Sequence, residues 1–447
     1  MSYVRCVYEH IGSTGTRKKL YALENGVYTV INGTSTLIYS DFGIIDSNWK
    51  ATNFNGSTYF FQRGHHPLVY DGTSMYRISN ASTYLGTVQQ SNEVLAAFGR
   101  LWNFDTPTDS YTLQWSDTLI GAAYSGGASG TLNLRTVFPK GVSKGVALAA
   151  FNNYLVIFCD KAILLYSGAD DPSTMALADT IDGIGCVSRD SVVDVGTDIF
   201  FLSDTGIRSL GRVVQERSSP IFDVGYMVRD DLIKDVKDHN ANENIKAVMN
   251  PEDGFYLLSL PGLKKSYCFD LKKRLENNVC RATVWTIGPS ALTTTRDKEV
   301  LFGMWENVGK YEGYTDNSKP YQFRYDSAYL NGDEKIADKM KVWKQCRVVI
   351  NGGAGYNLGL NWGFNYGDFE RGKTTTIEAF PTPSEYNDGE YGIDKYGYRP
   401  QFTKSVVFTL GGTGRVLQLQ IRTLVNGQPF SLQELTPFAK LARTQTR

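Results

Sequence analysis

The sequence predicts an all-β protein, a β-propeller followed by a C-terminal β-sandwich-like domain. Three observations favour this fold class. The chain has 27 Tyr, 23 Phe and 44 Gly but only 14 Pro, a balance typical of pleated strands joined by tight turns. Short apolar runs separated by brief polar breaks recur along the chain. Helical periodicity is scarce, and its best candidate is residues 223–244.

The clearest repeating unit contains the stretch FNNYLVIFCDKAILLYSG. Its two apolar runs are too short for periodicity alone to distinguish a strand from a helix. The flanking residues favour strands, because Asn152-Asn153 and Asp160-Lys161 are two-residue polar breaks of the kind that close hairpins. Together with the preceding VALAAF, residues 146–168 are therefore predicted to form a three-strand meander.

Similar units recur through residues 1–320, which we assign to the propeller domain. They lie near residues 19–41, 51–79, 94–117, 146–168, 191–212, 245–271 and 290–316. Their spacing is irregular but close to the roughly 40 to 50 residues of a four-stranded blade. We count six blades, or seven if the N-terminal unit is a blade of its own instead of completing the last one. A stack of β-sandwich domains is the rival interpretation.

The rhythm changes after about residue 320. We assign residues 321–438 to a small β-sandwich-like domain, because strands with Gly-rich turns follow one another there and apolar residues alternate from Val416 to Ile421. The Pro-, Gly- and Tyr-rich stretch 380–401 is expected to be a long surface loop. Residues 439–447 are predicted to be a polar, basic tail.

Charge and cysteine content restrict the function classes. The chain carries 46 basic and 46 acidic residues, whereas a protein that coats DNA would be strongly basic. The N-terminus lacks an apolar signal region and no apolar run reaches about 18 residues, so we expect neither a secretory leader nor membrane insertion. No two cysteines form a C-x-x-C pair, which predicts buried thiols made in a reducing compartment. These cysteines are Cys6, Cys159, Cys186, Cys268, Cys280 and Cys346.

Two short motifs resemble catalytic or phosphate-binding signatures. GSTGTRKK, residues 12–19, is rich in Gly and basic residues, but it lacks the spacing of a phosphate-binding P-loop and no helix pattern follows it. The Asp-Thr-Gly triplet at Asp204–Gly206 matches aspartic proteases, whose chemistry needs two such carboxylates, and the chain has one copy. We interpret the first motif as a polar loop, with non-specific contact of Arg17, Lys18 and Lys19 with a phosphate backbone as the alternative, and the second as a hairpin turn.

The chain has four histidines, and two of them, His65 and His66, are adjacent. Adjacent residues on a strand point to opposite faces, which argues against a two-histidine metal site and favours a loop or strand end. The basic residues of segment 335–347 are interpreted as a solvated face, with a DNA-facing or subunit-facing patch as the alternative. They are Lys335, Lys339, Lys341, Lys344 and Arg347. The sequence thus assigns no catalytic residue, no cofactor-binding residue and no metal ligand, and it predicts that the chain is not an enzyme and has no cofactor.

Residues 146–210 resemble a known family. An apolar hairpin that ends in Tyr166-Ser167-Gly168 precedes a segment that resembles the pattern of tail nozzle proteins of short-tailed bacteriophages. This group includes the packaged-DNA stabilisation protein. The matching residues are Gly185, Cys186, Ser188, Val192, Gly196 and Phe201–Ser203. The resemblance covers roughly residues 90–438 and consists of hydrophobicity and turns. The chain departs from the family before residue 50 and beyond residue 439.

The resemblance implies a structural virion protein that assembles as a homo-hexameric ring in the tail. Such a ring would be built in the host cytoplasm and would extend the DNA channel below the portal and the adaptor (the head-to-tail connector). It would help to retain packaged DNA, take part in DNA ejection and mount tail fibres, spikes or a tip. Its contact with channel DNA is expected to be weak and non-specific, because strong basic clamps would oppose ejection.

Two other function classes remain open. One is a carbohydrate-binding or carbohydrate-active propeller that contacts the host surface, which would need clustered carboxylates and Trp side chains over one blade face. The seven Trp are scattered along the chain. The other is a propeller scaffold in a cellular complex.

Overall fold

The computed structural model describes residues 3–31, 33–41, 48–138, 141, 143–216, 223–239, 244–275, 278–332, 334–378 and 403–442. The chain divides into two compact units, Met1–Tyr311 and Glu312–Arg447. The division precedes residue 320, where we placed it from the sequence, since the last strand of the first unit ends at Lys310.

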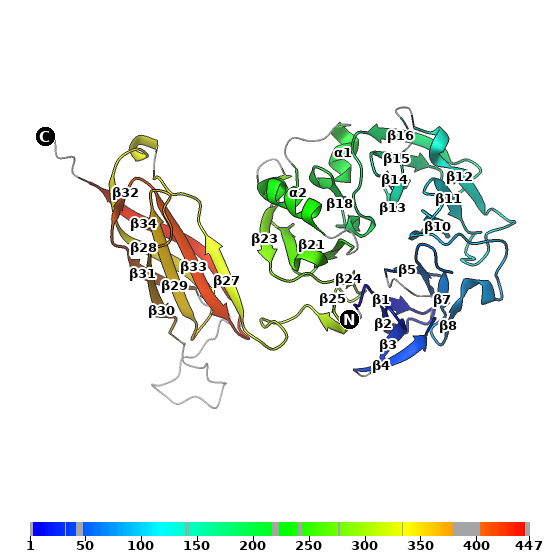
Figure 1. The fold of residues 1–447 in the computed structure, drawn as a ribbon, viewed down its shortest axis with the longest axis horizontal. Coiled ribbons are helices and arrows are strands. Elements are labelled where there is room, and N and C mark those ends of the chain that lie inside the picture. The colour runs from blue at the N-terminus through cyan, green and yellow to red at the C-terminus, as the bar shows by residue number, and fades with distance from the viewer. Residues whose placement is uncertain are drawn as a thin grey trace, which may run out of the picture. The chain divides into compact units, whose positions relative to one another are not determined.

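The first unit contains seven antiparallel sheets in the described residues, each built from strands consecutive in the chain (Figure 1). The first sheet contains β1(Cys6–Ile11), β2(Arg17–Leu23), β3(Gly26–Ile31) and β4(Thr34–Tyr39), and the second contains β5(Lys50–Phe54), β6(Ser57–Phe61), β7(Leu68–Tyr70) and β8(Met75–Arg77). The third contains β9(Glu93–Ala97), β10(Arg100–Phe104), β11(Thr112–Trp115) and β12(Gly130–Asn133). The fourth contains β13(Gly145–Phe151), β14(Tyr154–Cys159), β15(Ala162–Ser167) and β16(Ala176–Asp182).

The last three sheets of this unit include two with three strands. They are β17(Val193–Asp194), β18(Ile199–Ser203) and β19(Gly206–Ser209); β20(Lys246–Asn250), β21(Phe255–Leu260), β22(Lys265–Asp270) and β23(Arg281–Trp285); and β24(Ala291–Thr294), β25(Val300–Met304) and β26(Asn307–Lys310). Two helices follow β19, α1(Leu210–Glu216) and α2(Arg229–Asp238), and the second lies within the predicted helical segment 223–244.

The seven sheets are the blades of a closed β-propeller. The first strands of successive blades contact one another in the order β1, β5, β9 and β13. The 3-10 turn η3(Arg189–Ser191) contacts both β13 and β20, so it fills the innermost place of the fifth blade. Contacts of β20 with β24 and of β24 with β1 then complete the circle. The N–H of Val4 also donates a 2.6 Å hydrogen bond to the carbonyl oxygen of Trp305, which joins the chain start to the seventh blade.

The core of the propeller is distributed among the spaces between neighbouring blades. Seven clusters of buried side chains occur in this unit, and each combines residues of two adjacent blades. In β14, for example, Val156 and Phe158 pack toward the fifth blade, whereas Leu155 and Ile157 pack toward the third. This explains why YLVIFC is apolar at nearly every position: both faces of the strand are covered.

The predicted meander at residues 146–168 is confirmed. Asn152 and Asn153 close the first hairpin with φ values of 46° and 67°, the left-handed region that Asn tolerates well and that a tight hairpin requires. Asp160 and Lys161 close the second hairpin, between β14 and β15. The propeller fold of the sequence analysis is therefore correct, and the rival stack of sandwiches is not formed by this unit.

The suggestion that the N-terminal unit completes the last blade is wrong. Residues 6–39 form a four-stranded sheet of their own, and the seventh blade has three strands in the described residues. The unit predicted from the sequence begins at residue 19 and does not include β1, whose sequence CVYEHI mixes apolar and charged residues. That strand lies innermost, where Cys6 and Val7 are buried and Glu9 bonds the N–H of Arg296 in the seventh blade.

The second unit is a β-sandwich (Figure 1). One sheet has the order β27(Tyr321–Asp326), β33(Leu417–Val425), β29(Asn357–Phe364) and β30(Arg371–Thr376). In the other, β28(Lys341–Gly352) pairs along one edge with β34(Phe430–Leu441) and along the opposite edge with β31(Thr403–Thr409) and β32(Thr413–Gly414). One buried cluster contains side chains of both sheets, including Trp343 and Trp362.

The alternation predicted around Val416 to Ile421 places Leu417, Leu419 and Ile421 in this core. Ala439–Leu441 of the predicted tail belong to β34. The predicted loop 380–401 and the tail beyond residue 442 lie outside the described residues.

Gly185 provides a test of the packing between the fourth and fifth blades. A Cβ atom at this position would overlap the backbone of Asp160 and Lys161, so we expect Gly185→Ala to lower the free energy of unfolding by about 1–3 kcal/mol, as overpacking does. Thermal denaturation of the full chain measures the effect. Gly225→Ala is the matched control, because its added methyl group would meet its nearest neighbours at 3.5 Å, an ordinary contact. Equal melting temperatures for the two variants would contradict the prediction.

Candidate functional site at the propeller axis

A cavity of about 140 Å³ lies at the centre of the ring. It is lined by residues of β1, β5, β20 and β24 and by residues at η3, which are innermost elements of five blades. Three of the lining side chains are cationic: Arg5, Lys50 and Lys246. Asp190 is the one acidic residue that lines the cavity among the described residues.

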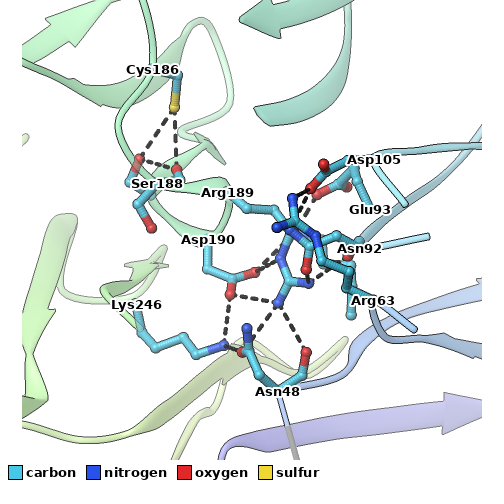
Figure 2. Close-up of polar contacts among 12 residues, drawn as sticks. Asn48, Arg63, Asn92, Glu93, Asp105, Cys186, Ser188, Arg189, Asp190 and Lys246 are labelled. Carbon is cyan, nitrogen blue, oxygen red and sulfur yellow. Dashed lines mark hydrogen bonds and ion pairs between the residues drawn. The ribbon is translucent and has the colours of Figure 1, made fainter. Parts of the chain in front are cut away.

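Arg189 is the centre of a buried polar network beside this cavity (Figure 2). Arg189 is 5% exposed to solvent. Its guanidinium donates to the Oδ1 atom of Asn92 at 2.9 Å and to the Oδ1 atom of Asn48 at 3.2 Å. Two further hydrogen bonds, at 3.0 and 2.8 Å, reach the carboxylate of Asp190. One side chain of the fifth blade therefore binds residues that lead into the second and third blades.

Three cationic side chains contact the Asp190 carboxylate. Besides Arg189, the ammonium of Lys246 lies 2.6 Å from its Oδ2 atom and that of Lys50 lies 3.5 Å from its Oδ1 atom. Burial alone would raise the pKa of the Asp190 carboxyl, but the neighbouring positive charges outweigh burial and hold this pKa well below its ordinary value. Lys246 also donates to Asn48 at 2.6 Å. The network thus joins the second, third, fifth and sixth blades.

Glu93, the first residue of β9, is the least satisfied member of the network. Its residue is 1% exposed, its Oε2 atom has no hydrogen-bond partner, and the nearest ion pair is with Nε of Arg189 at 3.9 Å. Burial raises the pKa of the Glu93 carboxyl to about 7, against the opposing charges of Lys50 and Arg189. Such a pKa suits general acid–base catalysis, but Glu93 does not line the cavity. Its chemistry is therefore closed to a substrate there.

The network was not found from the sequence. Arg189 and Asp190 lie in the segment CVSRDSVV, where an Arg-Asp pair is indistinguishable from a solvated turn. The one usable signal was that the pair interrupts a segment whose other residues are mostly small or apolar. Asn48, Glu93 and Lys246 are far apart in the sequence, and nothing in their local patterns links them.

The two catalytic-looking motifs form turns, as predicted. GSTGTRKK spans the hairpin between β1 and β2, and no helix follows it in the described residues. Of its basic residues, Arg17 pairs with Asp297, and Lys19 pairs with Glu299 at 3.1 Å. The Asp204–Gly206 triplet closes the β18–β19 hairpin.

The predicted loop position of the two histidines is confirmed, since both lie between β6 and β7. His65 is buried against the ring of Trp49, at a centroid distance of 4.8 Å, and His66 is exposed. No group of three or more His, Cys, Asp or Glu residues suited to a metal ion occurs in the described part of the chain. None of the described helices is long and apolar enough to cross a membrane.

The basic segment 335–347 is not a single solvated face. Lys341 is 1% exposed, and its ammonium donates to the carbonyl oxygens of Ala337, Lys339 and Arg415. Arg347 pairs with Glu434 across two strands at 2.7 Å. The interpretation of this segment as a solvated patch is therefore wrong for Lys341, whose role is to hold a loop against β28.

All six cysteines are free and buried, as the sequence predicted. Cys186 lies near the axial network and donates its S–H toward the carbonyl oxygen of Ser188 (Figure 2). Burial raises the pKa of the Cys186 thiol to about 12, so this thiol is protonated at neutral pH and is a poor nucleophile.

The comparisons with known proteins are consistent with this class of fold and go no further. No protein-family model matches the chain, and no curated protein matches it. The structure of streptogramin B lyase is 11% identical, covers 69% of this chain and 93% of its own, and has a TM-score of 0.38. The WD40 β-propeller domain of Doa1 is 11% identical, with coverages of 69% and 92% and a TM-score of 0.41.

A third similar structure, the Neurospora crassa Pan2 WD40 domain, is 9% identical, with coverages of 69% and 88% and a TM-score of 0.40. Identities this low bear on the fold alone. The strand contacts of the first unit define it as a β-propeller, and its axis carries a buried charge network. Its function has to be argued from its own residues.

Removing the central guanidinium tests whether the network stabilises the ring. We expect Arg189→Met to lower the free energy of unfolding by about 3 kcal/mol, because it removes the guanidinium donor to the Asn92 side-chain oxygen, leaves Lys246 as the donor to Asn48, and removes one of the charges that compensate Asp190. Chemical denaturation of the full chain measures this change. The control is Arg212→Met, whose pairing with Glu216 is on the surface of α1 and should be worth less than about 1 kcal/mol. A loss no larger than that of the control would refute the assigned role.

Glu93 makes a second prediction, on pH. The unfolded chain ionises this carboxyl near its ordinary value of 4.5, and the folded chain near 7. Between these values the folded chain binds more protons, so the contribution of Glu93 to stability falls as the pH rises. Glu93→Gln does not titrate at this position, so we expect its free energy of unfolding, relative to that of the wild type, to rise by about 2.5 kcal/mol from pH 5 to pH 8.

Denaturation curves at both pH values measure the gain. Glu306→Gln, at an exposed position in the seventh blade, should follow the wild type. Parallel behaviour of Glu93→Gln and the wild type would show that Glu93 ionises normally in the folded chain.

Proposed function

We propose that this chain is a structural subunit of a phage tail nozzle. It would form a homo-hexameric ring below the portal and adaptor, extend the DNA channel, help to retain packaged DNA and mount fibres, spikes or a tip. The observation that carries the proposal is the position of the residues that resemble the nozzle family. They lie in the connection between the fourth and fifth blades, which contains Arg189 and Asp190, and in the second strand of the fifth blade and the turn that precedes it.

Three of these residues illustrate the point. Gly185 packs directly against the backbone of the β14–β15 turn, where no side chain fits. The Ser188 hydroxyl donates to the carbonyl oxygen of Ile245, which precedes the sixth blade, at 3.2 Å. Phe201 lies in the buried cluster between the fourth and fifth blades. The resemblance therefore concerns a framework that holds blades together, which is what a building block of a ring requires.

The propeller axis is not the DNA path in this proposal. The cavity of about 140 Å³ at the axis is lined by Lys50 and Lys246, which bind Asp190. It is too small for duplex DNA, whose major groove alone is about 12 Å wide. DNA would instead pass through the space that six subunits enclose. Contacts there would be weak and non-specific, in keeping with a net charge of zero.

The second unit offers side chains suited to contacts with other subunits. Tyr321, Tyr325, Tyr329 and Tyr366 are 41%, 43%, 48% and 69% exposed. Tyrosine is enriched in protein–protein interfaces because its ring buries a large area and its hydroxyl group still finds a polar partner. These residues are candidate contacts to a neighbouring copy, the adaptor or a fibre.

The carbohydrate hypothesis has less support. It needs Trp side chains gathered on one surface, and five of the seven Trp are buried in core clusters or beside them. Trp285 stacks on Tyr311 with ring centroids 5.9 Å apart, and Trp305 is 52% exposed. A sugar ring would have one isolated indole to bind.

Virus particles that lack this chain test the proposal. We expect assembled particles to contain six copies in a ring, visible by electron microscopy, and we expect particles without the chain to lose DNA that is otherwise protected from nuclease. Supplying the chain in trans is the control and should restore protection. A strict monomer in the native particle, or unchanged DNA protection without the chain, would refute the proposal. A strong glycan-array signal would favour the carbohydrate hypothesis instead.

A further inference from the structure

The charges around the axial cavity do not balance. Arg189, Lys246 and Lys50 all contact Asp190, and this carboxylate is the one acid that lines the cavity among the described residues. A second buried acid, Glu93, forms one long ion pair with Arg189 at 3.9 Å and does not line the cavity. At the cavity itself, the ammonium groups of Lys50 and Lys246 therefore face one carboxylate, which Arg189 also contacts, and charge in such a place is costly unless it is paired.

The geometry leaves one of these cations available to a ligand. Arg189 and Lys246 are buried and already donate hydrogen bonds to Asn48, Asn92 and Asp190. Lys50 is different, because its ammonium is 3.5 Å from Asp190 and its side chain is 29% exposed. It lines the cavity, so its remaining donors can reach an occupant without breaking the network.

Trp49 is a second, independent observation at the same place. It lines the cavity, its residue is 2% exposed, and its indole Nε1–H group has no hydrogen-bond acceptor. A buried N–H group without an acceptor costs free energy. An occupant that carries acceptor atoms and negative charge would complement Lys50, and an acceptor atom within reach of Nε1 would satisfy Trp49 as well.

The geometry points to an anion-binding site at the propeller axis, with a compact oxyanion, either phosphate or a carboxylate, bound by Lys50 in the cavity that Arg5, Trp49 and Lys246 also line. The cavity volume of about 140 Å³ suits a group of a few heavy atoms and excludes a nucleic acid chain or an extended peptide. The site is independent of the proposed tail function. A bound anion would neutralise the excess charge and stabilise the closed ring.

Thermal denaturation of the full chain with added sodium phosphate tests the site, and sodium acetate forms a second arm that represents a carboxylate source. Sodium chloride at equal ionic strength controls for screening. We expect phosphate or acetate to raise the melting temperature saturably, by about 2 °C at concentrations well above the dissociation constant, since a ligand of the folded state alone stabilises it. Chloride should give a smaller shift. The anion that gives the larger rise in melting temperature, phosphate or acetate, identifies the chemical class that the site binds.

Variants assign the effect to the axis. Lys50→Met should abolish the rise and Lys50→Arg should keep most of it, while Lys19→Met should behave as the wild type, because Lys19 pairs with Glu299 in a comparably exposed surface contact away from the cavity. Broadening of the ³¹P resonance of inorganic phosphate by the wild type, but not by Lys50→Met, gives a readout independent of stability. Equal rises in chloride and the oxyanions, or a rise unchanged in Lys50→Met, would overturn the inference.

Discussion

The structure depends on each blade being covered on both faces by its neighbours. A single meander such as β13–β16 has two apolar faces and cannot be stable alone in water. Seven such sheets in a circle cover one another, and the contact of β24 with β1 leaves no blade with an open face. Because hydrophobic burial is spread over seven similar spaces, the ring is stable only as a whole, and its closure is the constraint on which everything else rests.

The axis is the weak point of this arrangement. The innermost strands converge there, and the side chains that pack beside the axis include the charged cluster of Arg189, Asp190 and Lys246. Buried ion pairs seldom add net stability, since desolvation offsets much of the attraction between the charges. They do impose geometry, because each donor accepts few partner positions. Hydrogen bonds from Arg189 to Asn48 and Asn92 fix the fifth blade relative to the second and third.

The polar groups at the propeller axis raise the question of a catalytic site, and their geometry restricts what they can offer to a ligand. Glu93 has a pKa of about 7 but lies outside the cavity lining, and the Asp190 carboxylate is occupied by cations. What remains accessible is positive charge around a small cavity. The same residues that hold the blades together thus create an electrostatic preference for an anion, and a structural role and a binding role need not be alternatives.

The sequence by itself determined most of the strands and turns, because local signals carry them: YLVIFC is apolar at nearly every position, and Asn152-Asn153 tolerates the dihedrals of a tight hairpin. It also predicted the repeat, the sandwich and the buried cysteines. It missed β1, whose mixed sequence makes sense only between two other blades. The axial network was decided by tertiary structure alone. Arg189 meets Asn48, which is 141 residues away, and burial of such a pair depends on ring closure, for which no local pattern exists.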